Sequence, residues 1–261
     1  MSISQIKLIN KLAQKKYRNE FKLFVAEGLR LCEEIPPEDI AFGFFTKEFL
    51  SDERATILIE RLKKSAQIEE INTATMERIS DTKTPQGILL VGRQKLSSPD
   101  KVVAKKIIAV LDGVQDPGNV GTILRTAAAF DCGVILLEGS ADIFNPKVIR
   151  SSMGAIFHMP ITVMTCAEFL SLMKSCDVEI LATALDSSAE IYWRYDYTRK
   201  PSAIIFGSEA NGVSQSLLDV SEKIFIPMRG HAESLNVATA TAIILSEVVR
   251  QHENATPTHI C

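Results

Sequence analysis

The sequence lacks the features of a membrane or secreted protein. No apolar run in its 261 residues approaches the roughly 20 that cross a bilayer. The first residues, Met-Ser-Ile-Ser-Gln-Ile-Lys, contain no apolar core of the kind that a signal peptide needs. Together these two absences predict a cytoplasmic protein.

Patterns for metal binding and for disulfides are missing as well. The five cysteines are odd in number, widely spaced and without a Cys-x-x-Cys pair, and the four histidines are scattered. We therefore expect neither a disulfide framework nor a metal site. The sequence also has no Walker lysine motif and no plausible Ser-His-Asp set, because nothing around His158 or His231 marks them as catalytic bases.

A strong excess of one charge is absent overall, but the net charge of −3 hides an uneven distribution. Between Met1 and Arg30 seven basic residues stand against two acidic ones, on a stretch with apolar residues at helical spacing. Such a face is typical of nucleic-acid contacts, because lysines and arginines neutralise phosphates. We predict RNA contacts at Lys15, Lys16 and Arg18; a solvated helix face is the alternative.

The order of expected elements predicts two α/β domains. Strands and helices alternate from Phe21 to Val91, and the polar stretch Gln94 to Lys105 interrupts this pattern. A second series begins with the apolar run Ile107 to Leu111, of the kind found in parallel sheets covered on both faces. We expect a small α/β substrate-binding domain at 1–94, a linker at 95–105 and a parallel-sheet α/β domain at 106–261.

Three glycine-containing loops follow buried strands of the second domain. They are Asp112 to Gly121, Phe206 to Gly212, and the turn from Ile226 through Gly230 to Asn236. In an open parallel sheet, ligands bind outside the carboxyl ends of the strands, so these loops are expected to form the site. Gly230 is expected to adopt backbone angles that other residues avoid, and Ser234 or Asn236 to cap the helix that follows.

A dinucleotide-binding loop does not fit the first of these loops. The fingerprint requires Gly-x-Gly-x-x-Gly between the first strand and helix, whereas Gly118-Asn-Val-Gly121 has different spacing and follows a longer loop. A nicotinamide-dependent α/β enzyme therefore stays only as a further hypothesis, to be recognised by binding of that cofactor.

The three loops resemble the motifs of the SpoU family of RNA ribose methyltransferases, part of the SPOUT superfamily. In order they are Asn119-x-Gly121-x-x-x-Arg125, Phe206-Gly207-x-Glu209-x-x-Gly212, and Ile226-Pro227-Met228-x-Gly230 continuing to Ser234-Leu235-Asn236. The resemblance covers Ile107 to Gln251 and extends more weakly to the N-terminal stretch.

The resemblance implies a fold, a cofactor and an assembly. SPOUT domains have a parallel sheet with a deep trefoil knot, an exception to the rule against threaded chains. S-adenosylmethionine would bind in that knot, and family members are homodimers whose sites draw on both subunits. The implied cofactor contacts are Gly207, Ile226, Met228, Leu235 and Ala184.

By the same resemblance, the reaction is methylation of a ribose 2′-hydroxyl in a structured RNA, with ribosomal RNA favoured over transfer RNA. The implied catalytic residues are Arg125, Asn119, Glu209, Ser234 and Asn236. Because a guanidinium titrates above about 12, we interpret Arg125 as a clamp for a phosphate rather than as a base. The alternative is a catalytically inactive RNA-binding or assembly factor on the same fold.

Overall fold

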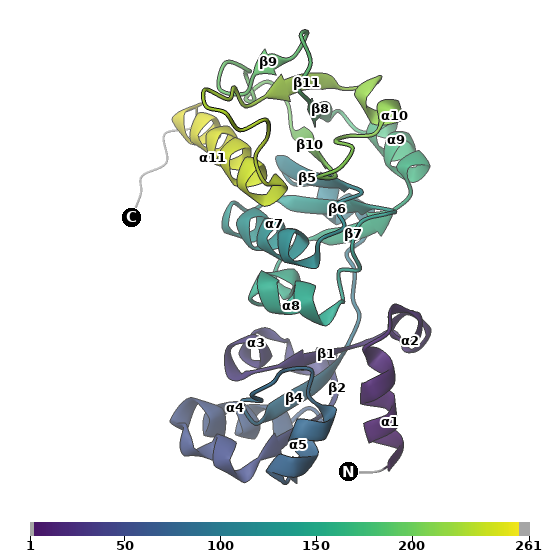
Figure 1. Cartoon of the computed structure of the whole chain (residues 1–261), viewed down its shortest axis with the longest axis vertical. Coiled ribbons are helices and arrows are strands. Elements are labelled where there is room, and N and C mark those ends of the chain that lie inside the picture. The colour runs from purple at the N-terminus through teal and green to yellow at the C-terminus, as the bar shows by residue number, and fades with distance from the viewer. Residues whose placement is uncertain (1–2, 256–261) are drawn as a thin grey trace. The chain divides into compact units, whose positions relative to one another are not determined.

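The computed structural model describes residues 3–255 and divides the chain into two compact units (Figure 1). The N-terminal unit comprises residues 1–95 and 142–157, and the C-terminal unit comprises residues 96–141 and 158–261. Cys261, one of the five cysteines counted above, lies outside the described residues.

The N-terminal unit is built on a four-stranded mixed sheet in the order β1-β4-β2-β3. β4 is antiparallel to both β1 and β2, and β2 and β3 are parallel. The strands of this sheet are β1 (Leu23–Glu27), β2 (Ile40–Thr46), β3 (Gln67–Ile71) and β4 (Ile88–Arg93). The helices and turns of the unit are α1 (Ile3–Leu12), α2 (Lys15–Phe21), α3 (Leu29–Glu34), η1 (Pro37–Asp39), η2 (Lys47–Ser51), α4 (Glu53–Lys63), α5 (Thr73–Ile79), α8 (Pro146–Ser152) and η3 (Ala155–Phe157).

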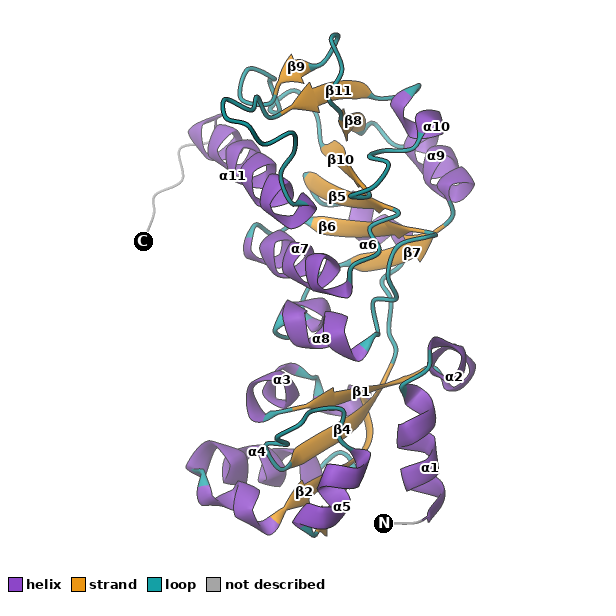
Figure 2. Cartoon of the chain, in the orientation of Figure 1, coloured by secondary structure: helices purple, strands orange, loops and turns teal. Residues whose placement is uncertain are grey.

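Helices of the N-terminal unit cover its sheet in two groups (Figure 2). On one face, α1 and α5 bury Ile9, Leu12 and Met76 against the strand residues Phe44 and Leu89. α3 and α4 form the other group. Each of these helices has an apolar stripe at the spacing that a surface helix needs, which is why the periodicity of the sequence predicted them.

The segment 142–157 belongs to this unit although it lies far along the chain. The rings of Phe144 and Phe157 stack on Phe24 of β1, with centroids 5.6 and 5.5 Å from it. The carboxylate of Asp142 accepts two hydrogen bonds from the guanidinium of Arg18, at 2.6 and 2.8 Å. The structure thus differs from the expected division, in which this segment was part of the domain at 106–261.

The C-terminal unit contains a seven-stranded sheet in the order β7-β6-β5-β10-β8-β11-β9, and every neighbouring pair is parallel. This confirms the predicted α/β class with a parallel sheet. Its strands are β5 (Ile107–Asp112), β6 (Gly133–Leu137), β7 (Ile161–Met164), β8 (Glu179–Thr183), β9 (Glu190–Ile191), β10 (Ser202–Gly207) and β11 (Glu222–Phe225). Its helices are α6 (Pro99–Val103), α7 (Pro117–Ala129), α9 (Cys166–Ser175), α10 (Gln215–Leu218) and α11 (Val237–Ala255).

Helices cover both faces of this sheet, as its apolar central strands require. α6, α9 and α10 bury Val102, Phe169 and Leu217 on one face. α7 and α11 pack side by side on the opposite face (Figure 1). β5 and β10, in the middle, are almost wholly buried.

Some elements differ from the sequence expectations. The expected linker at 95–105 contains α6, whose Val102 is fully buried, and the Ser97 amide donates a hydrogen bond to the Ile161 carbonyl at 2.8 Å. β7 and β9 were not predicted. β7 is an edge strand with Val163 40% exposed, and β9 has only two residues, so neither forms the continuous apolar run by which β5 was recognised.

Candidate functional site

The strand order brings the three motif loops to one edge of the C-terminal sheet. β10 lies between β5 and β8, and β11 lies on the other side of β8. Because all these strands are parallel, the loops after β5, β10 and β11 leave the sheet at the same edge. Asp112, the last residue of β5, ties two of them together, since its Oδ2 accepts a hydrogen bond from the Ser214 amide at 2.7 Å.

The first motif begins at the capped start of α7. The side chain of Asp116 accepts from the Asn119 amide at 2.8 Å, and Pro117 occupies the first turn, where its missing N–H costs nothing. A local residue therefore satisfies the helix start. The side chain of Asn119 is left to contact the other motifs.

The second motif folds into a tight turn after β10. Ser208 and Gly212 exchange backbone hydrogen bonds of 3.1 and 2.9 Å, and the Asn211 amide donates to Ser208 Oγ at 3.1 Å. A Cβ on Gly207 would lie 2.0 Å from the carbonyl carbon of Gly212 and 2.1 Å from the Val213 nitrogen. Glycine is thus required at 207 so that the loop can close on itself.

The third motif ends at the first turn of α11. Asn236 Oδ1 accepts from the amides of Ala238 and Thr239 at 2.9 and 3.3 Å, so Asn236 is the cap that the sequence predicted at this helix start. Ser234 is exposed and does not cap the helix. Gly230 has no positive φ, so the expected special backbone angles are absent there, whereas Gly212 has a φ of 68°.

Side chains of the three motifs join in one hydrogen-bond chain. Asn236 Nδ2 donates to Asn119 Oδ1 at 3.0 Å, and Asn119 Nδ2 donates to Glu209 Oε1. Residues 119, 209 and 236 come from three different motifs, so the chain fixes the motifs relative to one another.

This chain has a defined direction. Asn236 Oδ1 faces the helix start, where it accepts two helix amides. The end of the Asn236 side chain that faces Asn119 is therefore Nδ2, which can only donate. The amide of Asn119 must then accept with its oxygen and donate with its nitrogen, which leaves Glu209 as the acceptor at the end. A carboxylate suits that place because it accepts without donating.

A cavity of about 580 Å³ lies beside this chain, within the range of small-molecule sites. Eight of the predicted site residues line it, and they belong to the loops after β8, β10 and β11. They are Ala184, Gly207, Glu209, Ile226, Met228, Ser234, Leu235 and Asn236. The lining also includes the carboxylates of Asp186, Glu209 and Glu233.

Those features fit S-adenosylmethionine. The lining includes the apolar side chains of Ile226 and Leu235, which an adenine could contact, and Gly207, which has no side chain to keep a ligand from the backbone. The lining carboxylates suit a ligand with a sulfonium and an ammonium group, because opposite charges attract across short distances.

Asp186 is a cavity residue that the sequence reasoning missed. Lys223 Nζ donates to its Oδ2 at 2.8 Å, and the amide and hydroxyl of Ser188 donate to its Oδ1 at 2.8 and 2.7 Å. These contacts, that of Lys223 first, hold the pKa of the Asp186 carboxyl well below its usual range. Its position just after the carboxyl end of a parallel strand, β8, is the signal that could have identified it.

Arg125 does not line this cavity. It lies six residues beyond Asn119, on the exposed side of α7, and its side chain forms no hydrogen bond or ion pair with any residue between 3 and 255. Within one chain, the structure therefore brings Asn119, Glu209, Ser234 and Asn236 together and leaves Arg125 apart.

Of the three residues predicted to contact RNA, two are exposed and one is not. Lys15 and Lys16 are exposed at the start of α2. Arg18 is only 2% exposed; its Nη1 donates to the carbonyls of Leu12 and Ala13 at 2.8 and 2.7 Å, and it pairs with Asp142. The prediction that Arg18 contacts RNA was wrong, because its guanidinium is buried and bound to these partners and does not face a phosphate.

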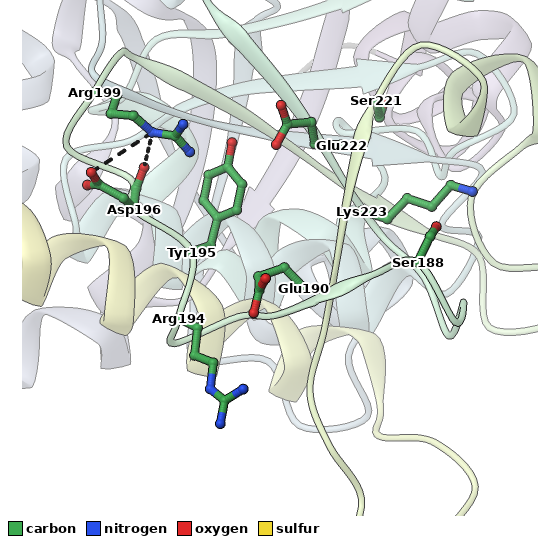
Figure 3. A pocket seen from close by; sticks show the side chains of 9 residues that line it. All are labelled: Ser188, Glu190, Arg194, Tyr195, Asp196, Arg199, Ser221, Glu222 and Lys223. Atoms are coloured by element: carbon green, nitrogen blue, oxygen red, sulfur yellow. Dashed lines mark hydrogen bonds and ion pairs between the residues drawn. The ribbon is translucent and has the colours of Figure 1, made fainter.

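A second pocket lies elsewhere in the C-terminal unit (Figure 3). It is lined by Arg194, Tyr195, Arg199, Glu222 and other polar residues but by none of the predicted site residues. Arg199 is paired with Asp196, and burial, together with the carboxylates of Glu179 and Glu222, raises the pKa of the Tyr195 hydroxyl. Its charges are mixed and partly paired, and no motif reaches it.

Between residues 3 and 255, no group of three or more His, Cys, Asp or Glu side chains is placed to hold a metal ion. Nor does this range contain a helix with the length and apolar character needed to span a bilayer.

Two family models match the chain. The SpoU rRNA Methylase family matches residues 106–246, which include all three motif loops. The MRM3-like substrate binding domain matches residues 4–90, in the N-terminal unit.

Individual relatives extend over nearly the whole chain. The 23S rRNA (guanosine(2553)-2′-O)-methyltransferase RlmP of Bacillus subtilis is 32% identical over 247 residues, covering 92% of this chain and 94% of the relative. The crystal structure of an AdoMet-bound rRNA methyltransferase from Sinorhizobium meliloti has a TM-score of 0.85 at 29% identity, covering 96% of each chain. That of a putative RNA methyltransferase of the TrmH family from Porphyromonas gingivalis has a TM-score of 0.82 at 32% identity, covering 96% of this chain and 99% of that chain.

Proposed function

The chain belongs to the SpoU rRNA Methylase family, and we propose that it transfers a methyl group from S-adenosylmethionine to a ribose 2′-hydroxyl of ribosomal RNA. It is an S-adenosylmethionine-dependent RNA 2′-O-methyltransferase by its similarity to enzymes of that activity along nearly its full length. The observation that carries the proposal is the chain Asn236–Asn119–Glu209, which joins all three motifs beside one cavity.

The proposed cofactor contacts are Gly207, Ile226, Met228, Leu235 and Ala184. All five line the cavity, which supports the assignment. When bound, the cofactor supplies an electrophilic methyl group on a sulfonium. Because that positive charge disappears as the methyl leaves, the protein gains most from aligning the ribose oxygen with the methyl carbon.

We assign the alignment to the motif side chains. Asn119 and Asn236, held in one orientation by their hydrogen bonds, and the exposed hydroxyl of Ser234 would position the ribose at the mouth of the cavity. Glu209 would fix the orientation of the Asn119 side chain by accepting the hydrogen bond from its Nδ2. The ribose hydroxyl must also lose its proton, which would pass to solvent water, and the guanidinium of Arg125 would stabilise the developing negative charge and hold a phosphate.

A homodimer would explain why Arg125 lies apart from the cavity of its own chain. We propose that a second copy packs against α7 and α11, so that Arg125 of one chain completes the site of the other. Exposed or half-buried small residues on this side, such as Thr239 and Ala242, support close packing. Light scattering of the full chain should give the mass of a dimer at micromolar concentration, and a monomer would refute this assignment.

We further propose that the chain is threaded into a trefoil knot and acts in the cytoplasm, where ribosomal RNA of bacteria is assembled. The match to the SpoU rRNA Methylase family supports the knot, and the strand order is compatible with it, since β10 lies between β5 and β8 although it follows both in the sequence. The expected cytoplasmic location follows from the proposed substrate.

The decisive experiment compares ribosomal RNA from cells with and without the gene by mass spectrometry of ribose methylation. One 2′-O-methylated nucleotide should disappear from ribosomal RNA and reappear when purified protein and S-adenosylmethionine are added. Calorimetry should detect binding of the cofactor. Cofactor and RNA binding without methyl transfer would instead identify an inactive assembly factor.

Arg125→Ala should lower single-turnover methyl transfer by about 100-fold, as expected for loss of one charge-stabilising donor, with little change in cofactor affinity. Arg194→Ala, which removes an exposed arginine from the second pocket, is the matched control and should leave the rate unchanged. Equal rates for wild type and Arg125→Ala would remove Arg125 from the mechanism.

A further inference from the structure

Two aromatic rings lie together at the surface of the N-terminal unit. Tyr17 and Phe21 are one turn apart on α2, with ring centroids 6.3 Å apart and planes inclined by 14°. Phe21 is 39% exposed and Tyr17 is half-buried. The two ring planes are thus nearly parallel, and both residues are partly exposed to solvent.

Lysine side chains surround this aromatic pair. The ammonium groups of Lys11 and Lys16 lie 5.1 and 5.8 Å from the Tyr17 ring centroid, within the range of cation–π attraction. Lys15 and Lys22 are exposed at the two ends of α2. Glu20 is the only acidic residue among the first 22 of the chain, so the surface is positively charged.

The base of this surface is firmly held. Arg18, between the two rings in sequence, points inward and donates to the carbonyls of Leu12 and Ala13 at the corner between α1 and α2. At the C-terminal end of α2, the side chain of Gln94 donates from Nε2 to the Arg18 carbonyl at 3.0 Å. The backbone amide of Gln94 donates to the Lys22 carbonyl at 2.8 Å. α2 therefore presents its outer side without needing to be ordered by a ligand.

We propose that Tyr17 and Phe21 form a stacking platform for unpaired bases of the RNA substrate, with Lys11, Lys15 and Lys16 holding the adjoining phosphates. The proposal rests on the proposed function only in taking the ligand to be RNA. Aromatic faces interleaved with basic side chains are the combination that binds single strands, since every base has a face to stack and every nucleotide has a phosphate.

The same chemistry selects against double-stranded RNA. In a duplex the faces of the bases are covered by their neighbours, and only backbone and groove edges are accessible. The lysines would attract either form, whereas the rings favour the unpaired one. The N-terminal unit would thus direct the enzyme to nucleotides near a loop, bulge or strand end.

The test measures binding of two RNAs to the full chain over a range of salt concentrations. The probes are a short oligouridylate and a blunt RNA duplex of equal length. The variants are Tyr17→Leu and Phe21→Leu, which keep apolar volume but remove a ring, Tyr17→Phe, which keeps the ring, and Lys11→Gln with Lys16→Gln. Trp193→Leu, which removes an exposed ring from the C-terminal unit, and Lys64→Gln are the matched controls.

Two separate effects are expected. Tyr17→Leu and Phe21→Leu should each weaken oligouridylate binding by about tenfold at every salt concentration, with duplex binding and the salt slope unchanged. Tyr17→Phe and both controls should bind as wild type. The double lysine variant should lower the salt slope for the oligouridylate by about 0.7 per lysine that contacts a phosphate.

The proposal is overturned if Tyr17→Leu binds the oligouridylate as wild type does, if both RNAs weaken equally, or if Trp193→Leu weakens binding as much. The proposal is also overturned if the wild-type protein binds neither RNA. Circular dichroism establishes that each variant is folded. Failure of the proposed function is seen separately, as absence of cofactor binding by calorimetry or of methyl transfer, neither of which depends on the platform variants.

Discussion

The first strand of each sheet ends in the same way, yet the chain that follows serves different purposes in the two units. β1 ends in Glu27-Gly28 and β5 in Asp112-Gly113, with the glycines at φ values of 94° and 67°. Both carboxylates bind neighbouring loops: Glu27 accepts from the Asp81 amide at 2.8 Å, and Asp112 from the Ser214 amide at 2.7 Å.

The difference lies in how the next helix is capped. In the N-terminal unit the first amide of α3, from Leu29, is satisfied by the side chain of Gln86, 57 residues away. In the C-terminal unit the local Asp116 caps α7, so the side chain of Asn119 is available to meet Glu209 and Asn236. When a neighbouring residue caps a helix, the side chains of its first turn can contact the site. When a residue from a distant loop caps the helix, that contact holds two parts of the fold together instead.

The largest effect should come from the buried ion pair of the N-terminal unit. Arg18→Met should lower the free energy of unfolding by about 3–5 kcal/mol, because Asp142 would stay buried without its partner. The single tryptophan, Trp193, lies in the C-terminal unit, so its fluorescence reports that unit, while circular dichroism reports both. In a urea titration, the midpoint of the circular dichroism transition should move to a lower urea concentration, and the midpoint of the fluorescence transition should stay unchanged.

The double variant Arg18→Met with Asp142→Asn should recover part of this loss, since the amide removes the uncompensated charge and keeps the oxygen that accepts from the Phe144 amide. If Arg18→Met unfolded at the wild-type urea concentration by both signals, Arg18 would be a surface residue after all.

The two strand-end glycines offer a second test. Gly207→Ala should cost about 3 kcal/mol, because its Cβ would strike the backbone of Gly212 and Val213. Gly28→Ala should cost about 1–2 kcal/mol, from its positive φ and because its Cβ would lie 2.9 Å from Gln86 Oε1, the side-chain atom that accepts from the Leu29 amide. Calorimetry should show cofactor affinity reduced by the first substitution and unchanged by the second; the reverse would contradict the placement of the site.

A smaller effect should follow from reversing the hydrogen-bond chain. Asn236→Asp alone keeps the helix cap but places an acceptor against Asn119, and Glu209→Gln alone weakens the other end; each should slow methyl transfer about tenfold. When both substitutions are combined, the amide of Asn119 can turn over, donating to the new carboxylate at position 236 and accepting from the new amide at position 209, so the rate should recover. Additive losses would show that the three side chains do not act as one directional chain.

The smallest effect concerns Asp186. Lys223, and then Ser188, lower the pKa of this carboxyl, so the ionised form stabilises the folded state. This contribution is complete above the usual aspartate pKa of about 3.9 and is lost as the pH falls toward the lowered value. Asp186→Asn should therefore lower the urea midpoint of Trp193 fluorescence near neutral pH. The difference from wild type should shrink at about pH 3, and a constant difference would exclude the ion pair as its cause.

Much of the fold could be predicted because local patterns agreed with the final structure. β5 was recognised from its apolar run, and the start of α11 from Asn236. The loops converge because parallel strands leave the sheet on one side, so Gly207 and Leu235 could be placed near each other without coordinates.

The rest depended on partners distant in sequence. Arg18 resembled its exposed neighbours Lys15 and Lys16, and only Asp142, 124 positions later, explains why it points inward. α6 was hidden in a polar stretch because a single buried residue, Val102, anchors it. Arg125 matched its motif, but its absence from the lining of the cavity could not be foreseen from spacing.

The assignment of residues 142–157 to the N-terminal unit has a consequence for synthesis. The chain crosses between the units three times, so neither is complete in one continuous stretch. Asp142, the partner of Arg18, is synthesised 124 residues later. Synthesis of these residues takes roughly 6–25 seconds at ordinary elongation rates, and the ion pair cannot form before then. Phe24 must likewise wait for Phe144 and Phe157. The first unit to begin emerging therefore cannot finish folding until more than half of the chain has been made.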